Sequence, residues 1–144
     1  MSVKQISVFL ENKPGYLCAL TQVLADNQID MRAFSLAEAS DFGIARIIVD
    51  DVYETATVLK DAGYICSMST VLAVSMSDAP GGLNKVLQVL AEHRINIEYM
   101  YAFLGGADTG KAYMIFKVAD AEKAQALLAA NGNRLVDQEE LSEL

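Results

Sequence analysis

An internal repeat constrains this chain more than any other feature of its sequence. When the chain is shifted by 66 residues, an apolar segment, a Pro-Gly pair and the helix-like segment after it fall on a second copy of themselves. Small slips in the loops extend the match, at offsets of 67 and then 69 residues. The matched pairs are Val8 and Val74, Pro14 and Pro80, Gly15 and Gly81, Leu17 and Leu83, residues 22–25 and 88–91, Ile29 and Ile95, Gly43 and Gly110, Leu59 and Leu128, and Gly63 and Gly132. We therefore expect two domains, 1–68 and 69–144, each small for a unit that folds on its own.

Each copy carries strand and helix signals in the same order, βαββαβ. Alternating apolar side chains indicate strands, and apolar side chains three or four residues apart indicate helices. In the first copy, strands are expected at 5–10, 29–36, 44–49 and 64–68, with helices after Pro14 and after Asp51. In the second copy, strands are expected at 71–76, 95–103, 112–118 and 134–136, with helices at 80–92 and from Asp120 to about 131, a hairpin turn at Gly105, Gly106 and Gly110, and one acidic turn at 137–141.

Several helix ends carry local signals. Asp51 stands three residues before a glutamate, which is the spacing of a capping box, and Asp120 stands at the equivalent helix start of the second copy. Pro14 suits a first helical turn, where its missing N–H group would have no partner in any case. Gly63 is expected to end the second helix in a left-handed conformation.

The element order predicts an α+β fold of two ferredoxin-like βαββαβ units, each with two helices packed on one face of a four-stranded antiparallel sheet. The other face of such a sheet is open. Phe34, Tyr99, Tyr101 and Phe103 are expected there, and an apolar patch of that size indicates an interface. We therefore expect such units to pair. The short join between the copies leaves open whether the final strands stay in their own halves.

Charge and hydropathy exclude several classes of partner. Lys and Arg total 11 against 19 Asp and Glu, a net charge of −8, and no basic run is present. We therefore expect no nucleic-acid or anionic-membrane surface. No apolar run approaches the ~20 residues of a membrane span. No signal peptide is visible at the N-terminus, and Cys18 and Cys66 are expected to be buried, reduced thiols, so we expect a cytoplasmic protein.

The residues that catalysis needs do not occur in a recognisable pattern. The single histidine, His93, follows a helix and is expected to be a solvated helix-end residue. Neither a phosphate-binding glycine loop nor a set of Cys and His with metal spacing is present. We therefore expect no catalytic residue, no metal, no cofactor and no enzymatic activity.

The two Pro-Gly motifs resemble those of the ACT domain family. They read Asn-Lys-Pro-Gly-Tyr-Leu at 12–17 and Asp-Ala-Pro-Gly-Gly-Leu at 78–83. An Ile-Asp-Met segment at 29–31 and an Ile-Asn-Ile segment at 95–97 open the second strand of each copy. The resemblance covers nearly the whole chain, twice. It implies a tandem, stand-alone regulatory module that binds a small molecule, commonly an amino acid, and whose sheets pair side by side.

The resemblance also implies where the ligand lies. The backbone at the helix start grips the ligand carboxylate, because a helix N-terminus carries unpaired N–H groups and a partial positive charge. The side chain ahead of each Pro-Gly accepts hydrogen bonds from the ligand ammonium, and a residue at the start of the second strand of a neighbouring module completes the pocket. The implied ligand-binding residues are Asn12, Pro14, Gly15, Tyr16, Leu17, Asp30, Asp78, Pro80, Gly81, Gly82, Leu83 and Asn96.

Structural roles compete with these assignments. Asn12 and Asp78 are also suited to cap their helices. Gly15 and Gly81 are also suited to close packing of helix on sheet. Asp30 and Asn96 are also ordinary turn residues at a strand entry. Tyr16 stands where the second copy has Gly82, and either covers a pocket or only the surface.

The two copies differ in charge. If the halves pair about a pseudo-twofold axis, the Asn12 loop faces Asn96 and the Asp78 loop faces Asp30. The first combination is neutral and suits a zwitterion, whereas the second brings two carboxylates together and repels a ligand carboxylate. We therefore expect one good amino-acid site and one weaker or differently selective site.

Three functions are consistent with these features. The first is a regulatory sensor that binds an amino acid between two ACT-like domains. The second is a regulatory subunit that acts in trans on an enzyme of amino-acid metabolism through protein contacts. The third is a small enzyme, because ferredoxin-like scaffolds host many chemistries. We expect the partners to be a small-molecule ligand together with a second copy in a homodimer or a metabolic enzyme.

Overall fold

The computed structural model describes residues 2–39, 41–104 and 110–144. Its contacts divide the chain into two compact units. One unit is Lys4–Ser69, and the other is Thr70–Leu144 together with the start of the chain up to Val3. None of the helices in the described ranges is long and apolar enough to cross a membrane.

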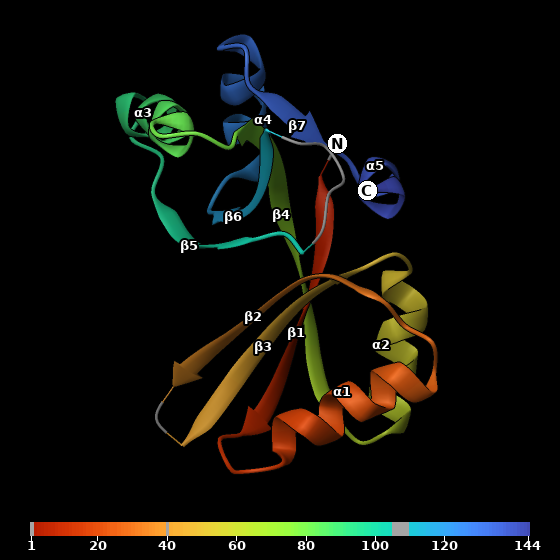
Figure 1. Cartoon of the computed structure of the whole chain (residues 1–144). Helices are drawn as coiled ribbons and strands as arrows, with labels where there is room; N and C mark the ends of the chain where they lie inside the picture. The colour runs from red at the N-terminus through yellow and green to blue at the C-terminus, as the bar shows by residue number, and fades with distance from the viewer. Residues whose placement is uncertain (1, 40, 105–109) are drawn as a thin grey trace. The chain divides into compact units, whose positions relative to one another are not determined.

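The first unit follows the order βαββαβ (Figure 1). Its elements are β1 (Val3–Glu11), α1 (Tyr16–Asp26), β2 (Met31–Ala39), β3 (Phe42–Val49), α2 (Val52–Asp61) and the first part of β4 (Ile65–Ser77). The strand order is β2-β3-β1-β4, and β3 is antiparallel to both β1 and β2. This is the strand order of a ferredoxin-like sheet, as the repeat predicted.

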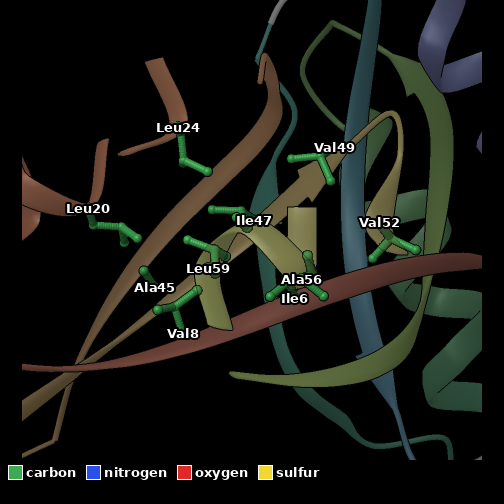
Figure 2. Packing of buried hydrophobic residues seen from close by; sticks show 10 residues of the cluster. All are labelled: Ile6, Val8, Leu20, Leu24, Ala45, Ile47, Val49, Val52, Ala56 and Leu59. Atoms are coloured by element: carbon green, nitrogen blue, oxygen red, sulfur yellow. The ribbon is translucent and has the colours of Figure 1, made fainter. Parts of the chain in front are cut away.

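One face of this sheet is covered by both helices. Figure 2 shows the resulting core, in which side chains of β1 and β3 meet those of α1 and α2. The core members are Ile6, Val8, Leu20, Leu24, Ala45, Ile47, Val49, Val52, Ala56 and Leu59. Each of these side chains is buried, and removal of this apolar surface from water is the main stabilising contribution to the unit.

The second unit repeats this plan with the last part of β4. Its further elements are α3 (Gly82–Glu92), β5 (Ile97–Ala102), β6 (Lys111–Val118), α4 (Ala121–Ala130), β7 (Arg134–Val136) and α5 (Gln138–Glu143). The strand order is β7-β4-β6-β5, which matches the order in the first unit strand for strand. Its core gathers Leu72, Val74, Met76, Val86, Leu90, Phe116, Val118, Ala124, Leu128 and Leu135. The expected α+β fold of two ferredoxin-like units is therefore confirmed.

Most of the predicted caps are present. The carboxylates of Asp51, Asp120 and Asp137 accept hydrogen bonds from backbone N–H groups three residues ahead, at 3.0, 3.1 and 2.9 Å. After α2, Gly63 has φ +90°, and the Tyr64 N–H donates to the Leu59 carbonyl at 3.0 Å. The Gly105 and Gly106 part of the expected hairpin turn lies outside the described residues.

The join between the copies differs from the expectation. Residues 64–68 and 71–76 were expected to be two strands with a loop between them, but β4 is one strand from Ile65 to Ser77. Its final part pairs with β6 and β7, and β7 pairs only within the second half in the described ranges. The last strand of the chain therefore stays in its own half.

Phe34 lies on the face of its sheet that the helices cover, and not on the open face where it was predicted. It was expected on the open face, but it packs against the core beneath α1 and α2. The pairing of β2 with β3 shifts register between Met31 and Ala33, so the alternation of side chains changes by one residue there. In the repeat Phe34 matches Met100, which packs against the second core in the same way.

Two described residues other than glycine have a left-handed backbone, Gln28 (φ 57°) and Arg94 (φ 56°), and each lies just after the first helix of its unit. This conformation costs a residue with a side chain about 1–2 kcal/mol. Substitution by glycine removes that cost, but part of the gain in stability is lost because glycine has more conformational freedom in the unfolded state. We expect Arg94→Gly to raise the free energy of unfolding by about 0.5–1 kcal/mol in urea denaturation. Gly132→Ala, at φ +82°, is the control and should lower it. A decrease for both variants would contradict the prediction.

Candidate functional site

Each Pro-Gly motif forms a tight turn that leads directly into a helix. In the first unit the Tyr16 N–H donates to the Lys13 carbonyl at 3.2 Å, and Gly15 has φ +88° and ψ −15°. In the second unit the Gly82 N–H donates to the Ala79 carbonyl at 3.0 Å, and Gly81 has φ +87° and ψ −7°. Positive φ at the third position is the property of a type II turn, with proline at the second position.

This geometry corrects the role expected for the proline. Pro14 and Pro80 precede the helices, which begin at Tyr16 and Gly82, so neither lies in a first helical turn. They fix the second position of the turn, where φ near −65° is required. The sequence pattern placed the proline near a helix start but did not distinguish the turn from the helix.

The turn leaves helix N–H groups without acceptors. The N-cap residues are Gly15 and Gly81, and neither helix has a side-chain cap. The Asn12 and Asp78 side chains therefore do not cap their helices, and that alternative is wrong. Next to each turn, the N–H groups of residues 17, 18, 83 and 84 make no hydrogen bond within the described ranges. Two adjacent donors at each helix start thus remain available to an anion.

The two glycines do not serve close packing of helix on sheet. A Cβ atom built on Gly15 or Gly81 meets nothing within 4 Å. Glycine is needed at these two positions because φ is positive there, and the space beside each turn is open. The packing glycine is Gly82, whose added Cβ would lie 2.0 Å from the Ser77 carbonyl oxygen at the end of β4.

The residues beside the turns differ between the copies. Tyr16 occupies the position of Gly82 and is 42 % exposed, so its ring stands at the surface by the first turn. Lys13 lies 2.8 Å from the Glu11 carboxylate, and the hydrogen bond to Glu11 is the main cause that raises the Lys13 pKa. Leu17 and Leu83 are half-buried and pack against the cores, which anchors both helix starts.

Asp30 and Asn96 lie far from the turn of their own unit. Asp30 precedes β2, at the C-terminal end of α1, whereas Asn12 lies before its N-terminal end. The 11 residues of α1 span about 16 Å. The same relation holds for Asp78 and Asn96 at the two ends of α3. Neither unit by itself brings its two polar positions together.

Asp30 also has a cation beside it. It lies 3.8 Å from the Arg32 guanidinium, which binds Asp50 through two hydrogen bonds of 2.8 and 3.0 Å. The hydrogen bond to Asp50 raises the pKa of Arg32, and partial burial opposes it. Asp30 further lines a small cleft of about 150 Å³ with Asp51 and Glu54. The half-buried Arg32 guanidinium therefore partly compensates the negative charge of Asp30.

Three cationic residues near the second turn were missed by the sequence reasoning. Lys85, Lys111 and Arg134 line a cavity of about 230 Å³ beside Gly82. They come from α3, β6 and β7, outside the Pro-Gly motif, so inspection of the motif did not find them. The repeat contained the signal, because the matched positions in the first copy are Ala19, Ile44 and Ile65.

The remaining reactive groups have ordinary surroundings. The His93 ring nitrogen Nδ1 lies 2.9 Å from the Val89 carbonyl oxygen, at the end of α3 as expected. Cys18 is exposed, which corrects the expectation of a buried thiol, and Cys66 is half-buried. Burial raises the pKa of the Cys66 thiol, which makes it less reactive. Among the described residues no group of three or more His, Cys, Asp or Glu is arranged to hold a metal ion.

The duplicated βαββαβ units, each with a Pro-Gly turn before an uncapped helix, define a tandem pair of small α+β modules. The chain matches the family described as "ACT domain pair" over residues 1–144, and it belongs to that family. The resemblance seen in the two motifs is therefore confirmed.

Solved structures agree with this assignment. Protein BT0572 from Bacteroides thetaiotaomicron is 35 % identical, with a TM-score of 0.91 over 100 % of this chain and 98 % of that one. The regulatory subunit of aspartate kinase from Thermus thermophilus is 18 % identical, with a TM-score of 0.66 over 92 % of this chain and 94 % of that one. The corresponding subunit from Thermus flavus is 20 % identical, with a TM-score of 0.63 over 90 % of each chain. At these lower identities the Thermus structures share the fold alone. No curated protein matches the chain.

Proposed function

We propose that the chain is a regulatory module that binds a free amino acid at the Pro-Gly turns. One observation carries the proposal. In each unit the helix after the turn begins with two adjacent N–H groups that have no acceptor in the described ranges. A carboxylate offers two oxygens to such a pair, and the partial positive charge of the helix end adds to the attraction. The open space beside Gly15 lets the ligand reach the backbone.

The first turn is the better amino-acid site in this proposal. Asn12 is exposed and neutral, and its amide oxygen is suited to accept a hydrogen bond from the ligand ammonium. Asn96 of a neighbouring module completes the pocket, because the equivalent residue of the same unit lies at the far end of α1. The combination of Asp78 with Asp30 carries two carboxylates and suits a zwitterion less well. Arg32 beside Asp30 partly compensates the negative charge of this second combination, which remains less suited to a zwitterion than Asn12 with Asn96.

The module regulates through contact with another protein. The likeness in fold to the regulatory subunit of an aspartate kinase supports an enzyme of amino-acid metabolism as the partner, and a second copy of the chain is the other partner that we propose. Both would act in the cytoplasm. The proposal assigns no catalytic step to any residue.

The test is a thermal-shift panel of the twenty amino acids on the full chain, followed by calorimetric titration of those that respond. A ligand that binds only the folded chain adds about 2.7 kcal/mol when it is present at 100 times its Kd. We expect at least one amino acid to raise Tm, and we expect Asn12→Ala to weaken that ligand about 10-fold without changing Tm in its absence. No shift with any of the twenty would overturn the proposal.

A control variant separates the site from general effects. Tyr53, on α2 of the same unit, is 68 % exposed and distant in sequence from the turn. Tyr53→Ala should bind the ligand as the wild type does. Gly15 is unsuitable for this test, because a side chain at φ +88° strains the turn whatever it does to the ligand. Two equal and independent sites per chain would contradict the preference for the first turn.

A further inference from the structure

The second unit contains a cavity that has a basic wall. Its volume is about 230 Å³, several times the ~30 Å³ that one water molecule occupies in the liquid. It is bounded by the end of β4, the start of α3, the start of β6 and the turn between α4 and β7, in the part of Figure 1 that carries these labels. The lining residues are Ser75, Met76, Ser77, Gly82, Lys85, Val86, Lys111, Gly132, Asn133 and Arg134.

The charge of this wall is of one sign. Three of the lining residues are cationic and none is acidic, in a chain whose net charge is −8. Arg134 forms an ion pair with Glu140. Lys85 and Lys111 form no ion pair and no side-chain hydrogen bond with any described residue. Two exposed lysines that line one cavity repel each other, and an anion bound between them would reduce that repulsion.

The backbone directs both lysines to this place. Lys85 lies one turn into α3, where its N–H donates to the Gly81 carbonyl at 3.1 Å. Lys111 opens β6 and pairs in register with Ser77, the last residue of β4. Gly82 lets α3 approach the end of β4 closely, so the start of α3 forms part of the wall of the same cavity.

The basic wall belongs to the second copy alone. The positions that match Lys85, Lys111 and Arg134 in the first copy are Ala19, Ile44 and Ile65, all apolar. The repeat therefore does not account for the cations. They occur in the second half only, beside its Pro-Gly turn.

We propose that this cavity binds a small dianion, either inorganic phosphate or a dicarboxylate of about four carbons. This inference rests on the proposed function, in which the N–H groups at a helix start bind an anionic group of the ligand. It specifies the class of ligand that binds at the second turn. Lys85 and Lys111 neutralise the two negative charges, and the N–H groups at the start of α3 donate to one anionic group.

The experiment is calorimetric titration of the full chain with sodium phosphate, with succinate and with acetate, at one ionic strength maintained with NaCl. We expect phosphate or succinate to bind at least about 10-fold more tightly than acetate. A preference for phosphate identifies a phosphate site, and a preference for succinate identifies a dicarboxylate site; both support the proposal. Equal, weak binding of all three would overturn it.

Matched variants locate the binding. Lys85→Gln combined with Lys111→Gln should weaken the preferred dianion at least about 10-fold, as expected when charge-assisted hydrogen bonds are lost. Lys123→Gln, which removes an exposed lysine of α4 outside the cavity, should leave the affinity unchanged. Wild-type affinity in the double variant would overturn the assignment. Asn12→Ala should leave dianion binding intact, so failure of the amino-acid site and failure of this site give different results.

Discussion

Gly82→Ala is expected to destabilise the second unit by about 3 kcal/mol, at the upper end of the usual cost of overpacking. The added Cβ would lie 2.0 Å from the Ser77 carbonyl oxygen, and the obstacle is backbone in a paired strand rather than a flexible side chain. To relieve the overlap, α3 must move away from β4, which opens the core around Val86 and Leu90. Urea denaturation followed by circular dichroism measures the loss.

The neighbouring glycine provides the comparison for this variant. Gly81→Ala meets no atom within 4 Å and suffers only the strain of φ +87°, about 1–2 kcal/mol. Gly82→Ala should therefore be the more damaging of two adjacent substitutions that are identical in chemistry. A smaller loss for Gly82→Ala than for Gly81→Ala would show that α3 does not approach β4 as closely as described.

Leu59→Ala is expected to cost about 3–4 kcal/mol in the first unit. Leu59 has no exposed surface and lies in the core between α2 and the sheet (Figure 2). Truncation of a buried leucine removes its transfer free energy and leaves a cavity, which together cost about 2–5 kcal/mol. A domain of this size has a total stability of only about 5–10 kcal/mol, so the midpoint of urea denaturation should fall steeply.

The same helix supplies the control for the core variant. Tyr53 is 68 % exposed, and Tyr53→Ala should change the free energy of unfolding by less than about 0.5 kcal/mol. The side chain of Tyr53 stands at a position whose helical spacing alone suggests the apolar face. Equal losses for Leu59→Ala and Tyr53→Ala would contradict the assignment of the core.

Local signals predicted most of the fold. Asp51 and Asp120 cap the helices that their spacing indicated, and the strand order follows from a repeat of βαββαβ units. The caps depend on residues three positions apart, and the strand order follows from the order of the elements in each copy. Phe34 was placed on the wrong face because a register shift early in β2 is a property of the strand pair, which the alternation in one strand does not reveal.

The candidate site was only partly predictable. The Pro-Gly turns could be located from sequence, because the backbone conformation depends on proline and glycine themselves. The cations could not be found in the motif, because Lys111 and Arg134 reach the start of α3 through strand pairing with β4 from about 30 and 50 residues further along the chain. The charge difference between Asn12 and Asp78 was visible in the sequence. The charge of the motif alone, however, does not predict the three cationic residues that line the cavity of the second unit.

The continuous strand β4 has a consequence for dissecting the protein. Within β4, Cys66 packs against the first core, and Leu72, Val74 and Met76 pack against the second. An insertion of one residue between them would turn the later side chains to the opposite face. A truncation at the boundary would leave one half with an unfinished edge strand. The two halves are therefore joined by a strand that contributes to both cores rather than by a linker.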